Sequence, residues 1–432
     1  MTITLERIQT QDTLPESTEV VIIGGGIVGV SAALTLAERN IPVVLIEKGH
    51  IAGEQSSRNL GWVRKTNRDA LDIPLAQAAD RLWKAMPERV GSSVGYKQAG
   101  IMFVTDDDKQ LQSHQNWLES VRGLDLDSRI LSSKEITSLT KASGQWKGAI
   151  YTPSDGRAEP SIAVPTMAKA AINKGAVMLQ DCAVRTLSFE AGKISGVVTE
   201  KGEIRCKQVL LAGGAWSRRF LSNHDISLPT LPLICSVLRT KPMEGPTDIA
   251  VGAGNFSFRK HKDGGFIITQ RGALDAPIGL DHLLIGHRYL DQLKHQRSFL
   301  RIKFGKFFAD DLKLSRRWKP SQVTPFEKVR TMNPAHNPSL ISEAMRNLTQ
   351  AWPEFKNAEI EEAWAGLIDV TPDSNPVIDH ISAIPGLTLA SGFSGHGFGT
   401  GPAAGHLAAD LVSGYQPIVD PKPYQFSRLS SH

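Results

Sequence analysis

The sequence predicts an α/β fold of two domains, one built on a parallel sheet and the other on a mixed sheet. Residues 19–23 (EVVII) and 42–47 (PVVLIE) are short apolar runs typical of buried parallel strands, and the alanine-rich segment 27–39 between them has a helical period. Two further apolar runs, 208–212 and 387–390, also end in glycine-rich turns. We therefore expect one parallel sheet assembled from distant parts of the chain.

These positions divide the chain into two closely packed domains. We expect a discontinuous Rossmann-like, nucleotide-binding domain over residues 17–65, 181–224 and 361–420. Residues 66–180 and 225–360 are expected to form a substrate-binding domain of mixed strands and helices. A length of 432 residues suits this division, and a hydrophobic content of 41% is ordinary for a folded globular protein.

Charge and cysteine content narrow the class of protein. The net charge of +5 is too small an excess to predict nucleic-acid binding. Cys182, Cys206 and Cys235 show no CxxC spacing, which indicates a reducing compartment. We expect no signal peptide and no transmembrane span, hence a cytoplasmic protein that is at most peripheral on the inner membrane. His282 and His287 lack acidic partners at ligand spacing, so we expect no metal site.

A glycine fingerprint follows the first predicted strand. Gly24, Gly26 and Gly29 match G-x-G-x-x-G, in which the glycines permit a tight turn, the approach of a pyrophosphate and close packing of helix on strand. Glu47 ends the second strand, where its carboxylate can accept hydrogen bonds from an adenosine ribose. The pattern indicates an adenosine pyrophosphate site and by itself leaves FAD and NAD open.

Four further segments resemble the D-amino-acid oxidase superfamily, which includes glycine oxidases, sarcosine oxidases and amino acid dehydrogenases. The run EKGHIAGEQSSRNLGWVR (47–64) resembles the loop next to FAD, and VLLAGGAWS (209–217) resembles a second flavin-contact strand. Residues 362–379 and 386–414 resemble the C-terminal flavin-binding signature. The similarity covers nearly the whole chain and implies FAD. It implies non-covalent FAD, because the residues before Thr371 lack the tethering cysteine of some sarcosine oxidases.

Within this superfamily, several short motifs are most similar to bacterial L-amino acid deaminases. These are IAGEQSSR (51–58), VTEKG (198–202), PTLP (229–232) and PFEKVR (325–330). Those deaminases carry an N-terminal membrane anchor that we expect to be absent here. The stretch SSRNLGWVR is closer to D-amino acid and opine-type dehydrogenases, so the chirality of the substrate stays open.

The resemblance implies a set of cofactor-binding residues. Ser56 and Ser57 are expected against the pyrophosphate or ribityl chain, Val184 at the adenine, and the glycines after residue 391 at the edge of the flavin ring. The full set is Gly24, Gly26, Gly29, Glu47, Lys48, Ser56, Ser57, Arg58, Gly61, Val184, Gly213, Trp216, Gly366, Asp373, Gly392, Gly395, His396, Gly397 and Gly399.

The function that follows is FAD-dependent oxidation of an α-amino acid to an imino acid, by hydride transfer from Cα to flavin N5. Water then hydrolyses the imino acid to a 2-oxo acid and ammonia, and the electrons pass to O₂ or a quinone. A secondary amine, such as an N-methyl amino acid or an opine, is the near alternative. A non-catalytic FAD subunit of a hetero-oligomeric oxidase and an NAD-linked dehydrogenase are two further ones.

Such a reaction depends on substrate orientation, which a bidentate arginine on the carboxylate provides. Arg271 ends the strand-like segment 265–270 and aligns by resemblance with the carboxylate-binding arginine of the deaminases. Arg330 is a predicted helper, and Arg64 a residue expected to flank the flavin ring. His396 has either a general-base role or a packing and hydrogen-bonding role.

Residues 298–318 combine aromatic and basic side chains. The run SFLRIKFGKFF contains four phenylalanines with Arg301, Lys303 and Lys306, and Arg316 and Arg317 follow. This pattern indicates either peripheral contact with an anionic membrane or an amphipathic helix that faces the core with a solvated basic side.

Overall fold

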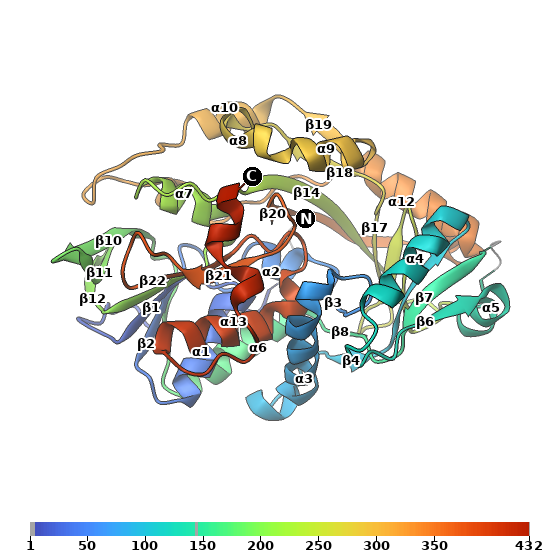
Figure 1. The fold of residues 1–432 in the computed structure, drawn as a ribbon, viewed down its shortest axis with the longest axis horizontal. Coiled ribbons are helices and arrows are strands. Elements are labelled where there is room, and N and C mark those ends of the chain that lie inside the picture. The colour runs from blue at the N-terminus through green and yellow to red at the C-terminus, as the bar shows by residue number, and fades with distance from the viewer. Residues whose placement is uncertain (1–4, 143–145, 432) are drawn as a thin grey trace.

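The computed structural model describes residues 5–142 and 146–431, and two large sheets organise them (Figure 1). The first sheet has six strands in the order β21-β22-β13-β1-β2-β9. Their bounds are β21 Val377–His380, β22 Leu387–Ser391, β13 Gln208–Leu211, β1 Val20–Ile23, β2 Val43–Ile46 and β9 Val177–Leu179. β21 is antiparallel to β22, and every other pairing in this sheet is parallel.

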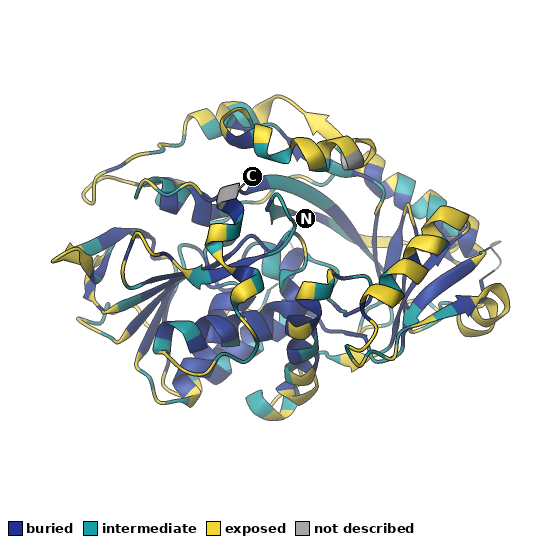
Figure 2. Ribbon diagram, viewed as in Figure 1, coloured by how far each residue is buried: buried dark blue, intermediate teal, exposed yellow. Residues whose placement is uncertain are grey.

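The predicted parallel sheet is confirmed. β1 pairs in parallel with β2 and with β13, and β13 pairs in parallel with β22. Layers of structure cover both faces, so that the strands are buried on both sides (Figure 2). This burial explains why the strands have continuous apolar runs rather than alternating ones.

Four helices pack against one face of the first sheet: α1 (Ile27–Glu38), α3 (Ile73–Val90), α6 (Pro160–Asn173) and α13 (Gly397–Ser413). Small residues let α1 and α13 approach closely, since a Cβ at Gly405 would lie 2.5 Å from the backbone oxygen of Val28. The opposite face carries α7 (Ser217–Ser222) and a meander of β10 (Val184–Glu190), β11 (Lys193–Thr199) and β12 (Gly202–Arg205).

The second sheet has ten strands and is mixed, as predicted. Its order is β19-β18-β14-β17-β16-β15-β5-β7-β6, with β20 paired to β14. The bounds are β19 Leu300–Lys303, β18 Leu274–Pro277, β14 Leu231–Thr240, β17 Phe266–Thr269, β16 Ser257–Lys260, β15 Ala250–Gly252, β5 Ile101–Thr105, β7 Gly148–Thr152, β6 Arg129–Ser132 and β20 Ile360–Val370. The helix α12 (Pro338–Ala351) packs on this sheet.

Short elements connect these layers. A small sheet contains β3 (Trp62–Val63), β8 (Gly156–Arg157) and β4 (Lys97–Gln98). The remaining α-helices of the described chain are α2 Gln55–Arg58, α4 Asp108–Ser120, α5 Ser133–Thr140, α8 Leu280–Ile285, α9 Leu290–Gln296, α10 Lys306–Leu312 and α11 Pro325–Lys328.

The sheets divide the chain differently from the predicted domain boundaries in two places. β9 lies in the range 66–180, yet it extends the first sheet beside β2. β20 lies in the range 361–420, yet it runs antiparallel to β14 along the second sheet. A strand of three residues gives too little local signal to assign it to a sheet. β20 overlaps the flavin-binding signature in sequence, but its long antiparallel pairing with β14 makes it part of the second sheet.

The expected amphipathic helix within 298–318 is wrong. The chain forms β19, which pairs with β18 at the sheet edge, and then the short helix α10. Gly305, with φ +152°, separates the two. The aromatic side chains do not all face the core: Phe304 is 74% exposed and Phe299 is 44% exposed.

Candidate active site

One large hollow lies where the parallel strands of the first sheet end. It contains about 1270 Å³ of space free of protein atoms, part of it open to solvent. The carboxyl-terminal residues of β1, β2 and β13, and Ala390 of β22, all line it. Ligands of doubly wound sheets bind at this edge. The lining segments are 23–28, 46–48, 52–56, 211–216, 367–369 and 390–398, each contributing some or all of its residues.

The glycine fingerprint forms the start of this hollow. Gly24 has a φ of +113°, and a Cβ at Gly29 would lie 2.1 Å from the Gly24 carbonyl oxygen, so the turn and the helix pack without room for side chains. The N–H of Ile27 donates to Ser56 Oγ at 2.9 Å. The next N–H groups of α1 have no intrahelical acceptor, and together with the helix dipole they favour an anion such as a pyrophosphate.

Glu47 holds its carboxylate at the end of β2, where it lines the hollow. The N–H of Gly25 donates to Oε2 at 2.8 Å, and the N–H of Gly49 donates to Oε1 at 2.7 Å. Burial raises the pKa of Glu47, against the lowering effect of Lys48 and of these two N–H donors. The oxygens retain lone pairs for the hydroxyls of a ribose.

The C-terminal glycine run completes the hollow at the start of α13. Gly395 and Gly397 line it. Asp369, on β20, lies opposite and accepts a hydrogen bond from the N–H of Gly392 at 2.7 Å. Burial raises the pKa of Asp369 to about 6.

The predicted cofactor residues fall into two groups. Those that line the hollow are Gly24, Gly26, Glu47, Lys48, Ser56, Val184, Gly213, Trp216, Gly395 and Gly397. Those that are absent from its lining are Gly29, Ser57, Arg58, Gly61, Gly366, Asp373, Gly392, His396 and Gly399.

Several residues of the second group make structural contacts. Arg58 donates to Asn333 Oδ1 at 2.8 Å and to the carbonyl of Gly53 at 3.0 Å. Asp373 accepts from Arg428 Nε at 2.7 Å. A Cβ at Gly366 would lie 2.1 Å from the side-chain oxygen of Gln55.

The guanidinium groups of Arg271 and Arg64 both lie near the ring of Phe103, a residue of the second sheet. The guanidinium of Arg271 lies 4.1 Å from the centre of the Phe103 ring, and that of Arg64 lies 5.8 Å from it. Burial lowers the pKa of Arg271 to about 10. Burial, with repulsion from Arg68 and Arg271, lowers the pKa of Arg64 to about 9. Both remain protonated at neutral pH.

Neither arginine of this pair has an acidic partner within 4.0 Å among the described residues. Arg271 is exposed to solvent in part, although the surrounding protein, including the Phe103 ring, is close enough to its guanidinium to lower its pKa. Among the described residues, the pair therefore carries two positive charges that no carboxylate contacts directly.

His396 lies near Arg64 of this pair, whereas Arg330 lies elsewhere. Burial, with repulsion from Arg68 and Arg64, holds the pKa of His396 well below its usual value, so the imidazole is neutral at pH 7. Arg330 forms a bidentate ion pair with Glu200 and donates to the carbonyl of Lys48 at 3.1 Å. The structure thus brings together three of the four predicted substrate residues.

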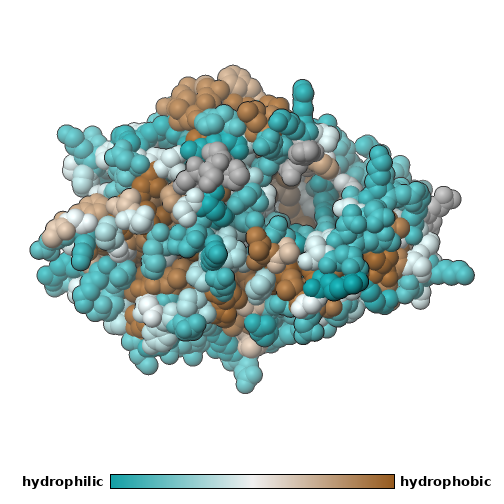
Figure 3. Space-filling view, viewed as in Figure 1, coloured by the Kyte–Doolittle hydropathy of each residue, from teal (hydrophilic) through white to brown (hydrophobic). Residues whose placement is uncertain are grey.

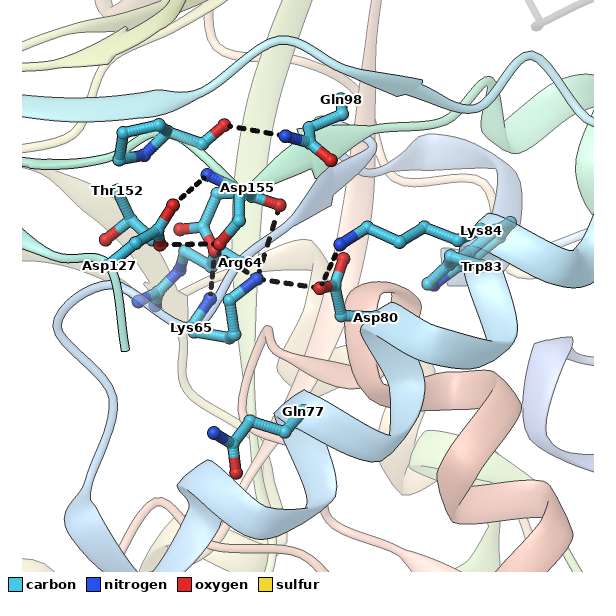
Figure 4. Close-up of polar contacts among 12 residues, drawn as sticks. Arg64, Lys65, Gln77, Asp80, Trp83, Lys84, Gln98, Asp127, Thr152 and Asp155 are labelled. Carbon is cyan, nitrogen blue, oxygen red and sulfur yellow. Dashed lines mark hydrogen bonds and ion pairs between the residues drawn. The ribbon is translucent and has the colours of Figure 1, made fainter. Parts of the chain in front are cut away.

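A buried polar network fixes the chain directly after Arg64 (Figure 4). The Asp155 carboxylate accepts from the backbone N–H groups of Lys65 at 2.8 Å and Thr66 at 3.1 Å. The Lys65 ammonium pairs with Asp155 and with Asp80, each at 3.0 Å. This network orients the segment that carries Arg64.

Comparison with known proteins identifies the family. The family model for DAO, FAD-dependent oxidoreductases, matches residues 19–411. The chain belongs to the DAO family. The predicted resemblance and the FAD cofactor are confirmed, and the NAD alternative is wrong. The protein is an FAD-dependent oxidoreductase.

Individual relatives come from several branches of the family. The structure of L-amino acid deaminase from Proteus myxofaciens, solved with anthranilate, has a TM-score of 0.93 and 32% identity, over 99% of this chain and 96% of that chain. Glycine oxidase of Pseudomonas putida is 24% identical over 94% of this chain and 98% of its own length. Mouse mitochondrial sarcosine dehydrogenase is 21% identical over 96% of this chain, which spans only 42% of that relative.

The hollow fits FAD. The N-terminus of α1 can bind the pyrophosphate, and the Glu47 carboxylate can accept hydrogen bonds from the ribose. Gly395 and Gly397 have no side chains, so the backbone at the start of α13 can lie close to the cofactor. Within the described residues, no three potential metal ligands cluster together. The helices of that same part of the chain include none with the length and hydropathy to cross a bilayer.

Sequence reasoning missed three residues that shape the site: Phe103, Asp155 and Asp369. Phe103 lies in the run IMFV, which reads as ordinary core, and Asp155 lies in PSDG, which reads as a surface turn. Asp369 lies within the flavin signature, so its position was available from the resemblance, but its burial was not.

Proposed function

We propose that this protein oxidises an α-amino acid to the imino acid, which water hydrolyses to a 2-oxo acid and ammonia. The observation that supports this most is the Arg271 guanidinium, which is charged, lies over the Phe103 ring and has no acidic partner within 4.0 Å in the described part of the chain. An uncompensated arginine of this kind suits bidentate binding of a carboxylate. FAD supplies the two-electron acceptor, and we propose that it is bound non-covalently, since the lining of the hollow includes no cysteine.

The residues around Arg271 have distinct proposed roles. Arg271 fixes the substrate carboxylate, and Arg64 adds a second positive charge that strengthens this attraction in an enclosed site. Phe103 supports the guanidinium of Arg271 from one side through its ring face. His396 is neutral and can accept a hydrogen bond from the substrate nitrogen without adding charge. Its low pKa makes it a weak general base, which favours a hydrogen-bonding role.

A secondary amine is the alternative substrate, because a sarcosine dehydrogenase is among the relatives and sarcosine is N-methylglycine. The test is anaerobic mixing of the FAD-loaded protein with L-amino acids, D-amino acids and N-methyl amino acids, while the visible flavin absorbance is recorded. We expect bleaching by primary amino acids of one enantiomer. Bleaching by N-methyl amino acids alone would establish the alternative, and no bleaching by any of them would refute the proposal.

We also propose a cytoplasmic location with peripheral membrane contact through the α8–α10 region. In Figure 3, a hydrophobic patch covers the part of the surface where Figure 1 shows α8, α9 and α10. Its exposed apolar side chains are Leu283, Leu284, Leu290, Leu293, Phe299, Ile302, Phe304 and Leu312. Exposed clusters of this kind mark interaction surfaces.

The contact is proposed to be mainly apolar, because many basic groups nearby are already engaged. Arg316 and Arg317 form ion pairs with Asp281 and Asp225, and Lys303 pairs with Asp275. Co-sedimentation with phosphatidylglycerol vesicles tests it. We expect binding by the native protein and weaker binding by Phe304→Ser; equal sedimentation of the protein with and without vesicles would refute the contact.

A further inference from the structure

Arg64 and Arg271 bring two positive charges to one aromatic ring. Their guanidinium groups lie 5.8 Å and 4.1 Å from the centre of the Phe103 ring. Because both distances are measured to the same point, the two cations cannot be farther apart than the two distances together. Burial, and then repulsion from Arg68 and Arg271, lowers the pKa of Arg64, so this arrangement has an energetic cost. Anions bound at the two arginines would offset that cost.

The carboxylates that act on Arg64 through space are already paired with other cations. Asp155 and Asp72 both stabilise the Arg64 charge from a distance. Asp155, however, pairs with Lys65 at 3.0 Å, and Asp72 pairs with Arg68 at 2.8 Å. Neither arginine near the aromatic ring forms an ion pair within 4.0 Å in the described part of the chain. Two guanidinium groups are therefore left over after the neighbouring carboxylates have been paired.

Both guanidinium groups retain the donors that a carboxylate needs. Arg64 Nη1 donates to the carbonyl of Thr66 and, at 3.3 Å, to that of Asn67. Among the described residues, Arg64 Nε and Nη2 have no acceptor, and these two atoms form an edge that binds a carboxylate in bidentate geometry. Arg271 donates to no described residue; it lies over the aromatic ring and against Gly252, where a Cβ would be 2.6 Å from Arg271 Nη1. Each arginine can therefore bind a carboxylate of its own.

The cofactor does not supply these anions. Arg64 and Arg271 are both absent from the described lining of the FAD hollow. The anionic part of FAD is its pyrophosphate, which the N-terminus of α1 can bind. His114, on α4, supplies no charge either, because burial and repulsion from Arg271 lower its pKa to about 4 and leave it neutral at pH 7. The substrate itself is then the source of negative charge for both arginines.

We propose that the substrate is a dicarboxylic amino acid, whose α-carboxylate is bound by Arg271 and whose side-chain carboxylate is bound by Arg64. The proposal rests on the amino acid oxidation proposed above. Aspartate and glutamate belong to this class, and the short chain between their two carboxylates can span two arginines that lie near one ring. A monocarboxylic amino acid would leave the half-buried Arg64 without a partner. Arg64 thereby selects against amino acids with apolar side chains, because its donors would then stay unpaired.

Dicarboxylate binding can be measured separately from the chemistry. Titration calorimetry of the oxidised, FAD-loaded protein compares glutarate with pentanoate, which has the same carbon chain and only one carboxylate. We expect the native protein to bind glutarate about tenfold more tightly, or better. Arg64→Met should lower the affinity for glutarate to that for pentanoate, whereas Arg64→Lys, which keeps the charge, should retain part of the preference. Arg122→Met is the matched control, since the Arg122 side chain is 78% exposed and pairs with Glu119.

Anaerobic bleaching of the flavin provides the second readout. We expect aspartate or glutamate of one enantiomer to bleach the native protein faster than norvaline does, and Arg64→Met to lose this preference. Faster bleaching by iminodiacetate than by either amino acid would overturn the assignment of the second carboxylate to the side chain.

The two proposals fail in different ways. Equal affinities of the native protein for glutarate and pentanoate would overturn the second carboxylate site, and this comparison decides the matter even if Arg64→Met does not fold. An unchanged preference for glutarate in folded Arg64→Met would overturn it as well. Preferred binding of glutarate without bleaching by any amino acid would refute the amino acid oxidation alone.

Discussion

Replacement of Arg271 with methionine should abolish most of the affinity for the substrate carboxylate while leaving the protein folded. A bidentate arginine donates two charge-assisted hydrogen bonds, each worth about 1.5–3 kcal/mol. At the lower value the loss is about 3 kcal/mol, which corresponds to roughly a hundredfold decrease in kcat/KM. The cation–π contact with Phe103 is also lost, but methionine retains an apolar contact with that ring.

Anaerobic stopped-flow mixing separates the effect on substrate binding from the effect on the rate of flavin reduction. The flavin reduction rate is measured against amino acid concentration, and the apparent Kd should rise about a hundredfold. Arg346→Met is the matched control, because Arg346 is exposed on α12 and makes no described contact with Arg271, Arg64 or Phe103. An unchanged Kd in Arg271→Met would refute the assignment of Arg271 to the carboxylate.

The same variant tests the electrostatic description of the site. The pKa of Arg271 is lower in the folded protein, at about 10, than the ordinary value of an arginine. The folded state therefore binds this proton less tightly than the unfolded state, so the charged group destabilises the fold below pH 10. That destabilisation is relieved as pH rises from about 10 toward the ordinary pKa of arginine. We expect the unfolding midpoint of Arg271→Met at pH 7 to equal or exceed that of the native protein; a markedly lower midpoint would contradict an uncompensated charge.

Three further predictions concern the cofactor turn, the buried network and the histidine. Gly29→Ala should sharply reduce the flavin content of the purified protein, because its Cβ would lie 2.1 Å from a backbone oxygen, whereas Gly254→Ala, with nothing within 4 Å, should retain full FAD. Asp155→Asn should destabilise the protein by about 1.5–3 kcal/mol in urea unfolding, because it removes one of the two carboxylates that pair with the buried Lys65 ammonium, and Asp108→Asn, at an exposed pair, by less than about 1 kcal/mol. Similar losses in the two variants would contradict a buried network. His396→Gln should not alter the shape of the pH dependence of flavin reduction between about pH 6 and 8, because the native imidazole is already neutral there. A native ionisation in that range that disappears in the variant would show that His396 titrates.

The first sheet could be predicted from the sequence because its signals are local. Each strand is an apolar run, and β1, β13 and β22 run directly into glycine-rich turns. Glu47 was predictable for the same reason, since its position at a strand end is set by the strand–helix–strand unit. The second sheet is set by long-range pairing, so its strand order and the membership of β20 had no local signal.

The charged residues of the proposed substrate site could be predicted from the sequence, but the residues that contact them could not. Arginines are recognisable as candidates wherever a carboxylate must be bound, and three of the four candidates meet in space. Arg330 could not be separated from the others, because its partner Glu200 is distant in sequence. Phe103 could not be recognised, since an aromatic residue inside an apolar strand has the same local pattern whether it faces the core or a ligand.

The first sheet has a consequence for how the protein is made. β1 is synthesised almost two hundred residues before its neighbour β13, and β22 and α13 follow after a further interval of similar length. The cofactor site therefore does not exist until α13 has been synthesised, and FAD can be captured only afterwards. Until then the apolar strands β1 and β2 lack β13, so the nascent chain carries unpaired strand edges that chaperones must shield from aggregation.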